Sequence, residues 1–269
     1  MKKDKKLSTL NMAVQNLKAK KLRTGFMMFF VILMSATVFF STVLMSNLKR
    51  GIKNTTERAG ADMIVIPNKG TEDIRDSLFA GTPCSVFFDK SWEKEVAKVK
   101  GVERVSAQIY AGTLSASCCD LPVQMIVFNP ETDFVVQPWL KDQDAVKLKK
   151  GEILVGNRVQ AEPGEKLRLY ATEFDVAGKL ERTGMGYDIS VFMTFDTFCK
   201  LKDSETARAN LPMDDIENKI SMLMVDTDNN LEGIDFFNLK KDIENAGTSG
   251  EEIYIGTADE LLSGISEQV

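Results

Sequence analysis

A run of 21 uncharged residues near the start constrains this chain more than any other feature. Residues 25–45 read GFMMFFVILMSATVFFSTVLM, and no charged residue occurs between Arg23 and Lys49. At about 1.5 Å per residue, a helix of this length covers roughly the 30 Å of a bilayer core. Its Phe, Val, Ile and Leu residues together favour insertion by about 3 to 7 kcal/mol. We therefore predict a transmembrane helix over residues 24–47.

A cleaved signal peptide is the main alternative to this transmembrane helix. Signal peptides carry apolar stretches of about 7 to 15 residues before a small-x-small cleavage site, whereas this stretch is longer and runs into MSNLKRG. Eight basic residues precede the stretch and four follow it within fifteen positions. The positive-inside rule then places Met1 in the cytoplasm and residues after about 48 outside it. We expect a protein of the cytoplasmic (inner) membrane with an extracytoplasmic domain.

The segments on both sides of the predicted span also show helical features. Leu7, Leu10, Val14 and Leu17 recur at helical spacing among many lysines. Residues 1–23 therefore predict a basic amphipathic helix on the inner leaflet, with a solvated basic tail as the alternative. Residues 48–58 are expected to continue the transmembrane helix as a polar stalk.

Charge divides the chain into two blocks of opposite sign. Residues 1–58 hold twelve Lys or Arg against two acids, a net charge of +10, and the remainder holds 22 basic against 37 acidic residues, a net charge of −15. The acidic block matches nucleic acid poorly, so we expect no nucleic-acid partner. The sequence contains no histidine and no phosphate-binding G-x-x-x-x-G-K-[ST] loop. These absences exclude Ser-His-Asp and Cys-His catalysis, and we expect a chain that is not an enzyme and has no cofactor.

The outer part predicts two strand-helix-strand units. GADMIVIP from Gly60, a short helix through Trp92 and Val96, and VERVSAQIY from Val102 form the first unit. ISMLMV from Ile220, a helix carrying Phe236, Leu239, Ile243 and Ala246, and IYI from Ile253 form the second. Two such units separated by a long segment are the pattern of a split βαβ, ferredoxin-like sheet, so we predict an α+β fold.

The middle segment, residues 114–196, predicts a β-rich insertion. It contains five short apolar runs, VQMIVF, EILVG, KLRLY, FDVAG and ISVFM, separated by turns at Pro130, Gly164 and Gly184. Gly184 and Gly186 supply only two glycines of G-x-G-x-x-G, because Ile189 takes the third place, so a hairpin turn is the favoured interpretation.

The last residues, 257–269, predict the start of another helix. Thr257-Ala-Asp-Glu260 is a capping box, and Leu261, Leu262, Ile265 and Val269 follow at helical spacing. Because no Gly or Pro ends this pattern, we expect the helix to continue beyond the given sequence. A frayed C-terminus is the alternative.

The four cysteines, Cys84, Cys118, Cys119 and Cys199, all fall in the outer part. A disulfide between the neighbours Cys118 and Cys119 would be strained, because adjacent Cα atoms lie only about 3.8 Å apart. Two arrangements stay open. Cys118 and Cys119 can each pair with Cys84 or Cys199, or Cys84 can form a single disulfide with one of the two neighbours. A sharper hypothesis makes Cys118 and Cys119 a thiolate metal or redox site, and structural or unpaired thiols are the alternative.

Several segments together resemble the permease subunits of the MacB and FtsX superfamily, the type VII ABC transporters. The basic run of residues 16–24 looks like the family's approach to its first transmembrane helix. GADMIVIP and Lys100-Gly-Val-Glu-Arg-Val105 are similar to its first two outer strands. EILVG from Glu152, GEKL from Gly164 and FDVA from Phe174 follow its inserted β-rich subdomain in order.

This resemblance implies a ferredoxin-like porter subdomain over residues 59–113 and 197–256, interrupted by a Sabre-like subdomain over residues 114–196. Residues 257–269 would lead to a second transmembrane helix. The implied partners are a separate cytoplasmic ATPase, a second permease chain and membrane lipid. ATP binding would be coupled to movement of the outer domain, a mechanism called mechanotransmission. The stretch from Ser117 to Asp120 resembles a branch linked to metal uptake.

A hypothesis of a different class is a membrane-anchored binding or sensor module that has no ATPase. It could be linked to thiols or metals through Cys118 and Cys119.

Overall fold

The computed structural model describes residues 20–58, 60–112, 119, 122–140, 147–211, 214–228, 234–247, 250–257 and 260–261, with the backbone alone for residues 45–58. The predicted amphipathic helix of residues 1–23 lies almost entirely outside this part of the chain. So does most of the predicted helix of residues 257–269. The chain divides into two compact units, the first ending at Lys53 and the second beginning at Asn54.

The first unit holds most of one long helix, α2 (Lys21–Arg58), whose last residues belong to the second unit. Among the described residues this is the one helix long and apolar enough to cross a membrane, over Lys21–Leu44. Its large apolar side chains are exposed, as Phe39 at 71 % illustrates. The hydroxyls of Thr37 and Thr42 donate to the carbonyls of Leu33 and Val38 at 2.9 and 2.8 Å. These polar groups are thus satisfied within the helix, as a lipid environment requires.

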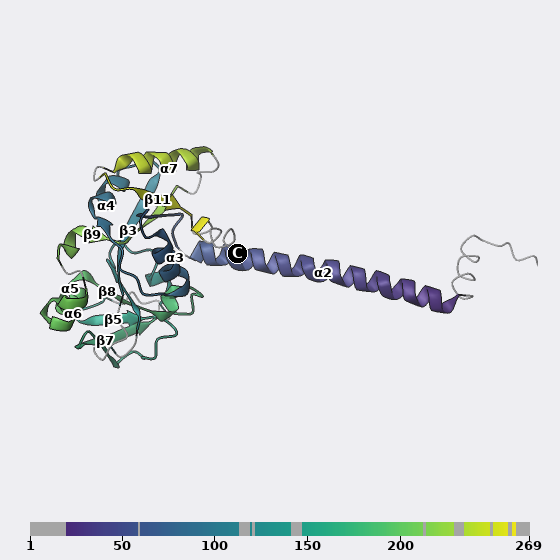
Figure 1. The fold of residues 1–269 in the computed structure, drawn as a ribbon, viewed down its shortest axis with the longest axis horizontal. Coiled ribbons are helices and arrows are strands. Elements are labelled where there is room, and N and C mark those ends of the chain that lie inside the picture. The colour runs from purple at the N-terminus through teal and green to yellow at the C-terminus, as the bar shows by residue number, and fades with distance from the viewer. Residues whose placement is uncertain are drawn as a thin grey trace, which may run out of the picture. The chain divides into compact units, whose positions relative to one another are not determined.

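The second unit is built on a nine-stranded sheet with the order β11-β1-β10-β3-β4-β8-β5-β7-β6 (Figure 1). Its strands are β1 (Met63–Pro67), β3 (Val102–Gly112), β4 (Gln124–Phe128), β5 (Glu152–Val155), β6 (Lys166–Leu169), β7 (Thr172–Lys179), β8 (Ser190–Met193), β10 (Met222–Thr227) and β11 (Ile253–Gly256). Two further short strands, β2 (Phe88–Asp89) and β9 (Lys219–Ile220), pair with each other.

The four strands β11, β1, β10 and β3 come from the two predicted strand-helix-strand units, and each neighbouring pair among them is antiparallel. Helices α4 (Ser91–Val96) and α7 (Ile234–Ala246) contact each other. Their buried side chains, Trp92, Val96, Leu239 and Ile243, belong to one hydrophobic cluster with Met63 and Val65 of β1. A Cβ added at Gly247 would lie 1.9 Å from the Trp92 ring, so only glycine lets α7 end against α4.

The other face of the sheet has its own hydrophobic cluster under α3 (Thr71–Ala80). Ile64 and Ile66 of β1 face this side, where Ile74 and Leu78 of α3 cover them. The strand β1 is therefore buried on both faces, with successive side chains in opposite cores.

The five short strands predicted in the middle segment all form, as β4, β5, β6, β7 and β8. The predicted hairpin at Gly184 is wrong, because β5 lies between β7 and β8 in the sheet. Residues 180–189 instead form a crossover that includes the 3-10 helix η2 (Gly186–Ile189). An added Cβ at Gly186 would lie 2.0 Å from the carbonyl oxygen of Ser77, so this glycine allows η2 to pack closely on α3.

Three helices were not anticipated: α3, α5 (Phe195–Phe198) and α6 (Glu205–Asn210). The shorter two hold only four and six residues, too few to establish a periodic pattern. Side chains cap both, since Thr194 accepts a hydrogen bond from the backbone N–H of Thr197, and Ser204 accepts one from that of Ala207.

The chain enters and leaves the sheet on adjacent strands. Ile64, at the start of β1, lies opposite Gly256, at the end of β11. The Asp62 carboxylate accepts hydrogen bonds from the backbone N–H and hydroxyl of Thr227, at 2.8 and 2.9 Å, and so fixes the start of β1 to the end of β10.

The capping box predicted after β11 is present. The backbone N–H of Glu260 donates to the Thr257 hydroxyl at 3.1 Å, and the N–H of Thr257 donates to the Glu260 carboxylate at 3.2 Å. Leu261 is buried in the same cluster as Ile64. The first turn of this helix is therefore fixed beside the start of β1.

The turn between β6 and β7 stores strain. Tyr170 and Ala171 have φ values of 50° and 61°, a region that favours glycine. Three hydrogen bonds hold Tyr170: its N–H donates to the Cys119 sulfur at 3.3 Å, its hydroxyl to the Gly112 carbonyl at 2.7 Å, and its carbonyl accepts from the Ser204 hydroxyl at 2.5 Å. The side chain of Ala171 is exposed and contributes little that could offset the strain.

Replacing Ala171 with glycine should therefore stabilise the domain by about 1 kcal/mol, because the strain disappears and no buried contact is lost. Urea unfolding of the two chains measures the difference. The matched control is Ala177→Gly within β7, which should destabilise by about 0.5 to 1 kcal/mol. Equal destabilisation by both changes would show that the turn is not strained.

Candidate functional site

An open hollow of about 720 Å³ lies where β4 and β8 end. These neighbours run parallel, so their carboxyl ends meet at one edge of the sheet. Phe128, Asn129 and Glu131 follow from β4, and Thr194, Phe195 and Asp196 follow from β8. The remaining lining residues are Lys90, Pro130, Gln137, Lys147, Leu148 and Lys150. Polar side chains lie here because both strands end at this edge, and no further strand residues cover it.

Hydrogen bonds fix the backbone of the walls. The Asp133 carboxylate accepts from the backbone N–H groups of Val136 and Gln137, the latter at 2.8 Å, and holds the start of the 3-10 helix η1 (Gln137–Trp139). The Thr197 hydroxyl accepts from the N–H of Gly151 at 3.0 Å, which ties α5 to the segment before β5. The hollow is therefore largely preformed in the backbone.

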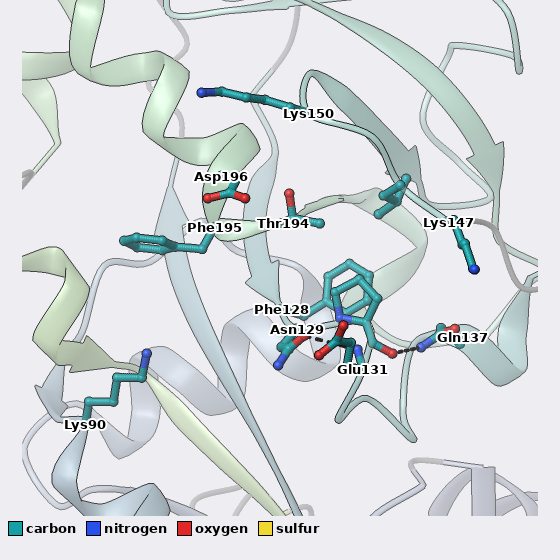
Figure 2. A pocket seen from close by; sticks show the side chains of 12 residues that line it. Lys90, Phe128, Asn129, Glu131, Gln137, Lys147, Lys150, Thr194, Phe195 and Asp196 are labelled. Carbon is teal, nitrogen blue, oxygen red and sulfur yellow. Dashed lines mark hydrogen bonds between the residues drawn. The ribbon is translucent and has the colours of Figure 1, made fainter.

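Three lysines surround the hollow. Figure 2 shows Lys90, Lys147 and Lys150 on three different sides of it, with Phe128 near the middle. All three are exposed, and none forms an ion pair with another described residue, whereas Lys98, Lys166, Lys179, Lys202 and Lys240 do. Within the part of the chain that the structure describes, no direct contact with a carboxylate neutralises their charge.

Two carboxylates and an apolar floor complete the lining. Glu131 and Asp196 are both exposed, so among the lining residues that the structure describes there are three lysines and two acids. Phe128 is 3 % exposed and belongs to the hydrophobic cluster under α3, and the half-buried Leu148 packs against the same cluster. The described lining thus combines half-buried apolar side chains with three lysines. Such a combination suits a ligand that carries both an apolar and an anionic part.

The structure describes only one of the two cysteines of the predicted thiol site. Cys119 is 9 % exposed and lies in the hydrophobic cluster beside Tyr170, whereas Cys118 lies outside the described residues. Cys84 and Cys199 are free thiols. No group of three Cys, Asp or Glu side chains within the described residues is arranged to hold a metal ion. A thiolate site at Cys118 and Cys119 stays a prediction.

The environments of Cys84 and Cys199 suppress the reactivity of their thiols. Burial raises the pKa of the Cys84 thiol to about 11, despite a hydrogen bond with Ser77 that opposes this effect. Burial also raises the pKa of the Cys199 thiol. Since the thiolate is the reactive form, neither environment is that of an activated cysteine.

Sequence reasoning missed the hollow. One signal was available, the basic run Lys147-Leu-Lys-Lys150, which stands out in an acidic domain. That run alone reads as a solvated loop, because the partners from β4, β8 and Lys90 come from distant parts of the chain.

Comparison with known families gives one clear match. A family model described as the MacB-like periplasmic core domain matches residues 24–232, more than three quarters of the chain. A search of curated proteins finds no significant match.

Two solved structures are similar in part. The periplasmic region of MacB from Actinobacillus actinomycetemcomitans shares 12 % identity with a TM-score of 0.49, covering 79 % of this chain and 96 % of that one. The extracellular domain of the noncanonic ABC-type transporter YknZ from Gram-positive bacteria shares 15 % identity with a TM-score of 0.44, covering 73 % and 98 %.

The Cys84 environment predicts slow alkylation in the folded chain. At pH 8 a pKa of about 11 leaves roughly a hundredfold less thiolate than an ordinary cysteine has, so iodoacetamide should modify Cys84 about a hundredfold faster once urea unfolds the chain. The native rate should rise with pH up to about pH 11, as the thiolate forms. Site-resolved mass spectrometry measures both rates. Equal rates in the folded and unfolded chain would show that folding does not raise the pKa of this thiol.

Proposed function

The chain belongs to the family of the MacB-like periplasmic core domain, found in components of MacB/FtsX-type transporters, and from this we propose that it acts as a permease subunit of an ABC transporter. In this proposal a separate cytoplasmic ATPase binds ATP, and α2 passes the resulting movement to the outer domain. The family match carries the proposal, because it begins inside the apolar helix and ends beyond β10. The chain itself performs no chemistry in this scheme.

The arrangement of the chain ends supports transmission of movement. The backbone enters on β1 and leaves on β11, which are paired neighbours, and both are joined to the rest of the sheet through β10. A displacement applied at this point is therefore passed to a continuous hydrogen-bonded sheet rather than to a loop. Burial of Leu261 and the capping box of Thr257 and Glu260 keep the chain packed on the domain just after β11.

We also propose that the outer domain divides into a ferredoxin-like porter region, residues 59–113 and 197–256, and a Sabre-like region, residues 114–196. The antiparallel order β11-β1-β10-β3, with α4 and α7 on one face, supports the first. The adjacent strands β4, β8, β5, β7 and β6 support the second. The pairing of β3 with β4 makes the sheet continuous between the two regions.

The proposed localisation is the cytoplasmic membrane, with residues 1–23 inside and the domain after about residue 48 outside. Its proposed partners are the ATPase, a second permease chain and membrane lipid. The net charge of +10 before residue 59 supports this orientation, because basic flanks stay in the cytoplasm.

Protease accessibility tests the orientation. Proteinase K added to intact spheroplasts should digest residues beyond Arg58 and spare an epitope tag placed before Met1. Lysis with detergent should expose the tag as well, which is the control for its cleavability. Digestion of the tag in intact spheroplasts, with protection of the domain, would reverse the topology.

Copurification tests the partnership. The full chain, expressed in its native host and extracted in mild detergent, should bring down an ABC ATPase and a second permease chain that mass spectrometry identifies. An unrelated single-span membrane protein carrying the same tag is the control. Recovery of the chain without any ATPase would favour the membrane-anchored binding or sensor module instead.

A further inference from the structure

The hollow at the ends of β4 and β8 departs from its surroundings in charge. Residues after Arg58 carry a net charge of −15, yet the described lining residues of this hollow include three lysines and two carboxylates. Cations placed around one hollow in an acidic domain raise the local concentration of anions only close to the site. The local reversal of sign therefore points to an anionic group as the ligand.

The floor of the hollow adds an apolar component. Leu148 and Phe195, both half-buried, offer apolar surface to the hollow. A small inorganic anion would make no use of this surface, whereas an amphiphile would bury its apolar part there.

The hollow also spans the two proposed regions of the domain. Lys90 belongs to the porter region, whereas Lys147, Lys150 and Asp196 belong to the Sabre-like region. The backbone N–H of Lys90 donates to the Asn218 carbonyl at 2.9 Å, which fixes this residue to the porter side. A ligand held between Lys90 and the other two lysines would link the two regions.

We propose that this hollow binds an anionic amphiphile, with its phosphate or carboxylate group among Lys90, Lys147 and Lys150 and its apolar part on Leu148 and Phe195. The inference rests on the proposed function in taking the outer domain as the part that contacts cargo. The carboxylates of Glu131 and Asp196 oppose anion binding, so they limit affinity and make it sensitive to salt.

Isothermal titration of the full chain in phosphatidylcholine nanodiscs tests the site, with dodecyl phosphate below its micelle concentration as the probe. The double change Lys147→Gln and Lys150→Gln should weaken binding about tenfold, because two cations next to the anionic group are lost. The matched control, Lys94→Gln with Lys100→Gln, removes the same charge from exposed lysines outside the hollow and should change affinity by less than about twofold. Asp196→Asn should act in the opposite direction and strengthen binding about two- to threefold.

Further probes separate the sources of binding. Inorganic phosphate and neutral dodecyl maltoside should each bind at least about tenfold more weakly than dodecyl phosphate, because each offers only half of the interaction. Equal affinity for inorganic phosphate, for the maltoside or for a short acidic peptide would overturn the proposal. An equal loss of affinity in the Lys147/Lys150 and the Lys94/Lys100 double variants would also overturn it.

The ligand test and the copurification test can fail separately. If dodecyl phosphate does not bind but an ATPase still copurifies, the proposed ligand is wrong and the proposed transport function stands.

Discussion

The pairing of β1 with both β10 and β11 is the constraint on which the rest of the domain depends. The five residues of β1 (Met63–Pro67) are buried, with side chains on both faces of the sheet, so the strand joins the two hydrophobic clusters. Because β1 follows the apolar helix and β11 precedes the capped turn at Thr257, the same pairing also brings both ends of the domain together. A change that weakened this pairing would disturb the core and the attachment of the domain at once.

The hollow depends on a different pairing, the parallel contact between β4 and β8. A parallel pair needs a long connection, and here residues 129–189 supply it while also forming β5, β6 and β7. The connection returns Lys147 and Lys150 to the edge where β4 ends, and Thr197 then fixes Gly151 beside α5. The position of these lysines is therefore a consequence of strand order. If the hollow binds an amphiphile, ligand binding and the relative position of the two proposed regions would be coupled.

Much of the fold was predictable because its signals are local. The strands of both strand-helix-strand units and all five strands of the middle segment were found from short apolar runs, and α7 from its helical spacing. Local patterns failed where neighbours in space decide the outcome. The turn at Gly184 was taken for a hairpin, because nothing in that segment reveals that β5 separates β7 from β8. Helices α5 and α6 escaped prediction because they are too short to show a period.

The sequence by itself determined the opposed charges of its two blocks, which follow from a count of residues, and also the apolar helix, the main strands, α7 and the capping box after β11. Each of the latter follows from residues within about twenty positions of one another, so hydrophobic periodicity and capping residues suffice to specify them. Only the tertiary structure decided the order of strands in the sheet, the burial that raises the pKa of Cys84, and the meeting of Lys90, Lys147 and Lys150. These features join residues far apart in the chain, and long-range packing, which no local pattern encodes, brings them together.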